Sequence, residues 1–363
     1  MHLHTSASRR AVAGFLHHSG ALAATRALTR SYHLSRHTLR LKKNTQPRFI
    51  ILCYHRVGTG GIPFYSELPT WKFEQQMHHI RRNYRLCSLD DLVEQLEEPK
   101  DSTPAVAVTF DDGYHGTYTE AFPILREYAI PATVYLAAGC IESGEVAWYD
   151  RLFLALQSIP SPHLDVAVAG RRFDLTTKES RIDATAQIVG HLRRIPQEER
   201  IRACAEIEAK TKLPQCELKN RMMSWAQIRE MQACGVKFEA HTMTHPVLSR
   251  LNSKAQENEI RESKCLIENR LGREVLHFAY PFGKPEDFTE ETTAILRRLN
   301  FRSAATTVWG VNDPGVLRFG LRRVQIGEDT SLANFAFNLA LLALQEPTTS
   351  DAPAAQMPEN CAT

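Results

Sequence analysis

Two adjacent aspartates, Asp111 and Asp112, end the apolar run VAVTFDDG. Like charges side by side repel each other, so the pair needs a better reason than turn chemistry, although Asp-Gly is a common turn sequence. Two histidines, His241 and His245, stand four residues apart in the segment HTMTH, which follows another apolar run. If this segment turns helically, both imidazoles lie on one face, within reach of a single metal ion.

A divalent metal ion held by two imidazoles alone is under-coordinated, so a third, anionic ligand is expected. Asp112 is the natural candidate, and the resulting set leaves positions open for water and substrate, as hydrolytic metal sites require. Taken alone, each motif has an ordinary explanation, as solvated histidines or as a turn. Their joint occurrence at strand ends favours the metal site. The ligand types predict zinc, with cobalt, nickel, manganese or iron as alternatives.

The elements that must position these residues are short apolar runs separated by amphipathic segments. This rhythm predicts repeated β-α units and a parallel sheet or barrel, whose strand ends would carry the polar residues. The predicted strands cover 48–55, 106–113, 131–138, 236–242, 276–283, 302–310 and 321–326. The predicted helices cover 70–84, 117–128, 224–235 and 256–272, and Ser224 with Gln227 fits a capping box.

Three segments depart from this rhythm. Residues 148–220 are polar and helix-prone, and we interpret them as a helical insertion after the third strand. Residues 1–47 hold eight Arg or Lys and no acidic residue, so they are excluded from the fold as a basic, disordered leader. The tail, 346–363, is rich in Pro, Ser and Thr and is also expected to be disordered. One domain, 48–345, is left, and its length and the 43% hydrophobic content allow a substantial core.

Composition excludes several classes of protein. The formal net charge of +3 comes from the leader, so the remainder is slightly acidic and no nucleic-acid-binding face is predicted. The eight cysteines are scattered without a C-x-x-C pair, which indicates a reducing compartment. No apolar stretch is long enough for a membrane span. We expect a cytoplasmic protein, while the basic leader leaves organelle targeting or an unusual export signal open. The oligomeric state is not predicted.

The segments TFDDGY, HTMTH and FAYPFG, each after a predicted strand and in this order, resemble the first three motifs of the polysaccharide deacetylases, the NodB-homology domain of carbohydrate esterase family four. The resemblance runs from about residue 49 to 327. It implies a deformed (β/α)7-type barrel and metal-dependent removal of acetyl groups from sugars. It also implies that Asp111 is the general base, that Asp112 ligates the metal with His241 and His245, and that Thr242 braces the histidine loop.

Two family features are missing, and the chain offers replacements. Where many members carry an arginine that pairs with the base, this chain has Ala279, and Arg323 in the closing LRRV is the candidate for orienting Asp111. The usual Leu-x-His that supplies the general acid is absent after the last strand. Branches that resemble the poly-N-acetylglucosamine deacetylases carry this histidine on the first strand, so His55 in LCYHRV is expected to protonate the leaving amine.

Contacts to the substrate are predicted from the third motif and the insertion. The backbone N–H of Phe282 would hold the oxyanion, and Tyr280 and Trp148 are candidate substrate contacts. The predicted function is removal of N-acetyl or O-acetyl groups from a polysaccharide or glycan. Two alternatives remain open: a deacylase of a small amide on the same fold, and a carbohydrate-binding pseudoenzyme.

Overall fold

The computed structural model describes residues 47–58, 67–99, 103–211 and 221–344. The leader up to residue 46 and the tail from residue 345 lie outside these segments. At the centre of the described residues is a parallel sheet with the strand order β11-β10-β9-β6-β5-β1-β12. The strands are β1 (Phe49–Tyr54), β5 (Ala105–Phe110), β6 (Ala132–Leu136), β9 (Lys237–Ala240), β10 (His277–Ala279), β11 (Ser303–Ala305) and β12 (Val324–Gln325). All seven predicted strand runs are therefore present.

The sheet curls until its two edges are joined by one short segment. Val324 of β12 pairs with Leu52 of β1, while Leu321, three residues earlier, bridges to Ala305 of β11. Hydrogen bonds from Thr306 N to Leu321 O (2.8 Å) and from Leu321 N to Ala304 O (3.0 Å) hold that bridge. The barrel is closed here by irregular backbone instead of a full-length strand. A further short strand, β4 (Arg85–Leu86), pairs with β5.

Both faces of the strands are buried, which explains their nearly continuous apolar sequences. Along β1, Phe49, Ile51 and Cys53 point into the barrel, and Ile50, Leu52 and Tyr54 pack outward under the helices. The interior also contains the small side chains Ala107, Ala279 and Ala305 beside the large Tyr135. Small residues at these positions leave volume in the interior for larger side chains.

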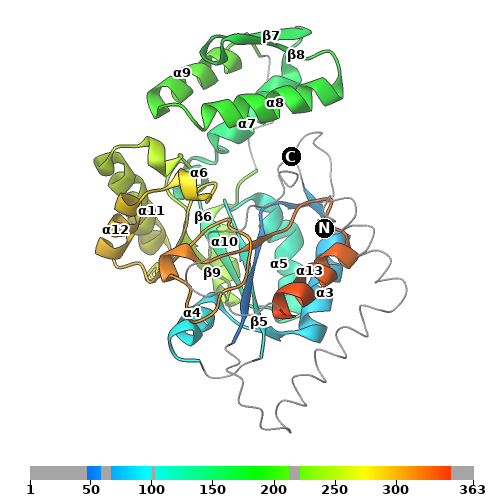
Figure 1. Ribbon diagram of the computed structural model, residues 1–363, viewed down its shortest axis with the longest axis vertical. Helices are drawn as coiled ribbons and strands as arrows, with labels where there is room; N and C mark the ends of the chain where they lie inside the picture. Colours follow the sequence, from blue (N-terminus) through cyan, green and yellow to red (C-terminus); the bar gives the residue numbers. More distant parts are fainter. Residues whose placement is uncertain (1–46, 59–66, 100–102, 212–220, 345–363) are drawn as a thin grey trace, which may run out of the picture.

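Helices cover the outside of the sheet, with α3 and α13 on one side and α11 and α12 on another (Figure 1). Capping fixes several of their ends: the predicted capping box of Ser224 and Gln227 is confirmed, and Asn252 caps the start of α11. The helices are α3 (Thr70–Asn83), α4 (Leu89–Glu97), α5 (Phe122–Glu127), α6 (Ala138–Ser143), α10 (Trp225–Ala233), α11 (Ser253–Leu271), α12 (Glu290–Arg298) and α13 (Leu332–Leu344). Shorter elements are β2 (Val57–Gly58), β3 (Leu68–Pro69), η1 (Thr117–Ala121), η4 (Leu248–Arg250), η5 (Pro285–Asp287) and η6 (Arg318–Gly320).

The insertion after the third barrel strand forms a small layer with its own apolar core (Figure 1, green). It contains α7 (Trp148–Ser158), β7 (His163–Val166), η2 (Ala167–Ala169), β8 (Arg171–Asp174), α8 (Lys178–Leu192) and α9 (Gln197–Glu208). The antiparallel hairpin β7–β8 was not predicted, although its alternating buried and exposed residues and the left-handed Gly170 at the turn are signals of one. No helix in the described part of the chain combines the length and apolar composition needed to cross a membrane.

Candidate active site

Three buried side chains that follow β5 and β9, the two strands on either side of β6, form a candidate metal site. Asp112 follows β5, His241 follows β9, and His245 lies four residues further along the loop. The Nε2 atoms of His241 and His245 lie 3.5 and 3.4 Å from Asp112 Oδ1. One ligand atom from each of the three residues can be chosen so that all lie within 4.8 Å of one another. This is the spacing that a single bound cation requires.

Some buried polar atoms of this cluster have no hydrogen-bond partner among the described residues, as expected for atoms that bind a metal ion. Asp112 Oδ1 is buried and accepts no hydrogen bond from the described residues. His241 Nδ1 lies 2.7 Å from the carbonyl of Ala279, which fixes its proton there and leaves Nε2 with a lone pair. A buried carboxylate oxygen without a donor is costly, so a cation between these groups fits the residues present.

The charge states of the ligands also suit a cation. Burial lowers the pKa of His245 to about 3, so its imidazole is neutral at physiological pH and offers a lone pair. Burial alone would raise the pKa of Asp112, but the neighbouring His245 and His241 outweigh it and lower that pKa, so the carboxyl remains ionised. Two imidazoles and one carboxylate are the donor set expected for zinc and similar ions.

The loop carrying the histidines is not the helical turn that the four-residue spacing suggested. Thr242 (φ 67°) and His245 (φ 54°) both adopt left-handed backbone conformations, and so does Asp112 (φ 72°). The Thr242 hydroxyl donates to the His241 carbonyl and accepts from the backbone N–H of His245 at 3.1 Å. A β-branched residue rarely adopts positive φ, so this conformation is strained and is held by the surrounding contacts.

Two neighbouring elements hold the histidine loop in that conformation. The backbone N–H groups of Ala138 and Gly139, where α6 begins, donate to the carbonyls of Thr242 and Met243 at 2.9 Å. A Cβ on Gly139 would lie 2.7 Å from the Met243 oxygen, so only glycine permits this approach. Glu259 of α11 accepts hydrogen bonds from Met243 N and Thr244 N, each at 2.9 Å. Glu259 cannot be recognised from the sequence, since nothing in an amphipathic helix distinguishes one glutamate from its neighbours.

Asp111, next to the metal-site aspartate, is held by an arginine that directly precedes β12. Arg323 is fully buried and donates from Nη1 to Asp111 Oδ1 at 2.7 Å and from Nη2 to Oδ2 at 2.8 Å. Its Nε donates to the carbonyl of Thr306 at 2.8 Å, which fixes the plane of the guanidinium. Burial disfavours the ionised carboxylate, but Arg323 outweighs it and holds the pKa of Asp111 well below its usual range.

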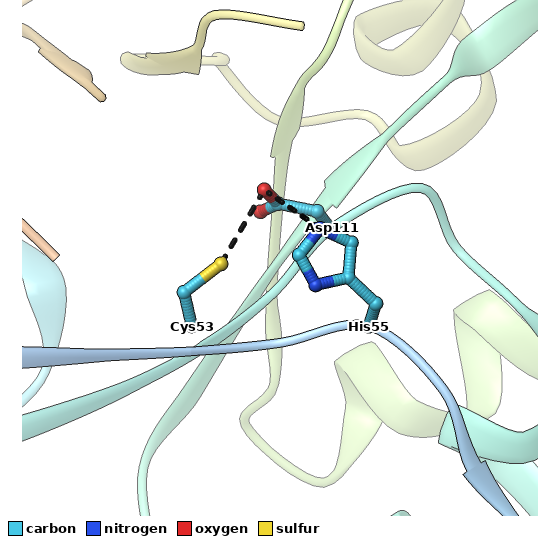
Figure 2. A group of neighbouring side chains, drawn as sticks. All are labelled: Cys53, His55 and Asp111. Atoms are coloured by element: carbon cyan, nitrogen blue, oxygen red, sulfur yellow. Dashed lines mark hydrogen bonds and ion pairs between the residues drawn. The ribbon is translucent and has the colours of Figure 1, made fainter. Parts of the chain in front are cut away.

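Two residues of β1 and the loop after it reach the same carboxylate (Figure 2). The Cys53 thiol donates to Asp111 Oδ2 at 3.6 Å, and His55 Nε2 lies 3.8 Å from that oxygen. The side chain of His55 is 37% exposed, so it faces the solvent side of the site. Loss of water around the ring lowers the pKa of His55, although Asp111 acts in the opposite direction. Cys53 was not singled out from the sequence, but period-two alternation along a strand places it on the face of His55.

Aromatic side chains line the site next to His245. The rings of Phe282 and Tyr149 lie 4.8 and 5.0 Å from the His245 ring, and Trp148 Nε1 donates to the His245 carbonyl at 3.2 Å. Phe282 has φ 60°, and its backbone N–H donates to no described residue, whereas its carbonyl accepts from the Thr307 hydroxyl at 2.7 Å. That N–H therefore remains available to a ligand.

The prediction that Tyr280 contacts substrate is corrected by its position. Tyr280 follows Phe278 on the outward face of β10, whereas Ala279 points into the barrel. The Tyr280 ring is fully buried and stacks on Phe288 at 3.8 Å, and its hydroxyl donates to the Phe319 carbonyl at 3.0 Å. The side chain packs under the outer helices and does not reach the candidate site.

Comparison with known proteins finds the same family that the sequence motifs resemble. Residues 98–304 match the family model for polysaccharide deacetylase. YxkH of Bacillus subtilis (strain 168) is 21% identical over 297 residues, which cover 81% of this chain and 77% of its own.

Two solved structures are similar to the chain over most of the length of both. The deacetylase PplD of Streptococcus pyogenes, in complex with acetate, is 20% identical over 82% of this chain and 99% of its own, with a TM-score of 0.56. IcaB of Ammonifex degensii is 22% identical over 82% of this chain and 97% of its own, with a TM-score of 0.53. These similarities confirm the predicted deformed barrel. Because the matched family model covers more than half of the sequence, the chain belongs to the polysaccharide deacetylase family of hydrolases.

Proposed function

We propose that the protein is a metal-dependent hydrolase that removes N-acetyl or O-acetyl groups from a polysaccharide or glycan. The proposal is based on the different partners of two adjacent aspartates. Asp112 faces two buried histidines, while Asp111, one residue earlier, is clamped by Arg323. A cation would keep Asp112 ionised as a ligand, whereas Asp111, which Arg323 holds ionised, would be the carboxylate that accepts a proton.

Asp112, His241 and His245 would hold the ion, with zinc as the first candidate and cobalt, nickel, manganese or iron as alternatives. When bound, the metal acts as a Lewis acid toward the acyl carbonyl and makes water more acidic. The residues of the chain supply the remaining steps. Asp111 accepts the proton of the attacking water, and Arg323 fixes the direction of its carboxylate.

Charge that develops on the acyl oxygen needs a donor, and the unused N–H of Phe282 is suited to that task. Removing one such donor typically costs about 3 to 4 kcal/mol of activation free energy. His55, on the solvent side of Asp111, would protonate the leaving amine. Trp148, which is half-buried beside His245, is available to contact a sugar ring.

Acetate release from acetylated glucosamine oligomers and from acetylated small amides tests the proposal. We expect release from the oligomers, loss of release with a chelator, and loss of at least about 10²-fold in Asp111→Asn. Asp90→Asn is the matched control, because Asp90 binds His277 at the other end of β10 (3.0 Å). Turnover that survives both chelation and Asp111→Asn would contradict the mechanism, and preference for the small amides would contradict the substrate class.

A further inference from the structure

The hydroxyl group of Tyr149, in the insertion, donates its proton to Tyr114 and not toward the candidate metal site, for the following reasons. The hydroxyls of Tyr149 and Tyr114 are 3.1 Å apart, and either atom could be the donor from this distance alone. The neighbours of Tyr114 decide the direction. Asp150 Oδ2 accepts from the Tyr114 hydroxyl at 2.6 Å, and Arg56 donates to the same hydroxyl oxygen at 2.6 Å.

A tyrosine hydroxyl has one proton and two lone pairs. Asp150 is fully buried and ion-paired with Arg56, so it is an ionised carboxylate that only accepts. The single proton of Tyr114 therefore goes to Asp150, and Arg56, which cannot accept, occupies one lone pair of Tyr114. The second lone pair of Tyr114 must accept the proton of Tyr149. The oxygen of Tyr149 is then left as an acceptor.

The ring that carries this acceptor lies beside the candidate metal site. The Tyr149 ring is 5.0 Å from the ring of His245 and 5.7 Å from that of Phe282, whose backbone N–H is unused. Among the described residues, the Tyr149 hydroxyl bonds only to Tyr114, and the side chain is only partly buried. After burial, the charge of Asp112 is the largest influence that raises the pKa of Tyr149, in keeping with a hydroxyl close to that carboxylate.

We propose that Tyr149 is a specificity residue that accepts a hydrogen bond from the N–H of the substrate acetamido group. The inference rests on the proposed function and narrows it to N-acetylated glycans. Hydrolysis joins water to the acyl carbon and breaks the C–N bond, giving acetate and a protonated amine. An O-acetyl ester presents an oxygen with lone pairs where the amide presents N–H, so it cannot donate to Tyr149 and places two acceptors face to face.

The test compares acetate release from glucosamine oligomers acetylated on nitrogen with release from glucose oligomers acetylated on the 2-oxygen. For Tyr149→Phe we expect kcat/KM on the N-acetyl substrate to fall about tenfold, the factor that one neutral hydrogen bond supplies. We expect kcat/KM on the O-acetyl substrate to stay unchanged or to rise, because the variant removes the acceptor that faces the ester oxygen. Equal losses on both substrates would overturn the proposal, because a packing role of the ring or hydroxyl would affect both alike.

Two further variants make the result specific. Tyr118→Phe removes a hydroxyl that bonds to Glu230 outside the site (2.7 Å), so its N-acetyl to O-acetyl ratio should match that of the unaltered protein. Tyr114→Phe keeps Tyr149 but removes the acceptor that fixes its proton, and we expect a smaller drop in the ratio. An unchanged ratio in Tyr114→Phe would contradict the proton-direction step. If the metal-loaded, unaltered protein releases acetate from neither substrate, the proposed function fails instead.

Discussion

Replacement of Arg323 by methionine removes a buried positive charge and leaves the carboxylate of Asp111 without its main partner. Both side chains are almost completely buried, and two charge-assisted hydrogen bonds of 2.7 and 2.8 Å join them. Each bond of this kind contributes about 1.5 to 3 kcal/mol, and breaking a buried ion pair by removing one partner costs about 3 to 5 kcal/mol. We expect Arg323→Met to lower the free energy of unfolding by about 3 to 5 kcal/mol at neutral pH.

The loss should depend on pH in a definite direction. With Arg323 present, the folded-state pKa of Asp111 is lowered, so the pair stabilises the fold above the unfolded pKa of about 3.9 and the stabilisation is lost as pH falls through the folded pKa. Without Arg323, burial raises the folded-state pKa of Asp111 instead. The stability difference between the two proteins is therefore expected to be largest at pH 7 and smaller at pH 5, where protonation relieves the buried charge.

Urea unfolding at both pH values measures these differences. Arg322→Met is the matched control, since Arg322 is the adjacent arginine, is half-buried and makes no bond to Asp111. A double-mutant cycle with Asp111→Asn isolates the interaction, and we expect a coupling of at least about 1.5 kcal/mol. Two results would refute the claim that Arg323 holds the carboxylate of Asp111. In one, the stability losses of the two single variants add up to that of the double variant within about 0.5 kcal/mol. In the other, the Arg323→Met protein is as stable as Arg322→Met.

Three further predictions concern the loop, the acid and the metal. Thr242→Val should lower the free energy of unfolding by about 1 to 3 kcal/mol, because the His245 N–H loses its acceptor, whereas Thr242→Ser keeps the hydroxyl and should be at least as stable as the original in urea titrations. If His55, whose pKa is lowered, is the general acid, kcat should fall as pH rises through that pKa. His55→Gln should lower kcat by about 10²- to 10⁴-fold and should abolish this decrease at higher pH. A His55→Gln protein whose kcat still falls over the same pH range would contradict the acid role. Chelation should lower the thermal midpoint, and zinc should restore it, but neither change should occur in Asp112→Ala.

The strands and their polar ends could be predicted because short, nearly continuous apolar runs and the order of the motifs are local properties of the sequence. Alternation would also have placed Tyr280 correctly. His277 and Ala279 share the inward face of β10, so Phe278 and Tyr280 must point outward under the helices. The prediction relied on motif position instead of register, and it was wrong for that reason.

The parts that could not be predicted depend on tertiary contacts. The positive φ values of Thr242 and His245 occur in a loop that is held by contacts with α6 and α11, and the four-residue spacing, which carries no information on these contacts, suggested a helical turn instead. The approach of Tyr149 to His245 likewise depends on how the insertion packs onto the barrel. Arg323 is a candidate from the sequence only because Ala279 leaves Asp111 without the usual arginine, whereas the paired hydrogen bonds to Asp111 depend on the fold.

The proposed mechanism gives the two adjacent aspartates different roles, and its most direct test separates metal binding from turnover. Purified Asp111→Asn and Asp112→Ala proteins are loaded with zinc, and bound metal and acetate release are measured on the same samples. The account predicts that Asp111→Asn retains about one ion per chain and loses at least about 10²-fold in turnover, whereas Asp112→Ala loses both metal and turnover. Full turnover in Asp111→Asn, or one tightly bound ion in Asp112→Ala, would contradict it.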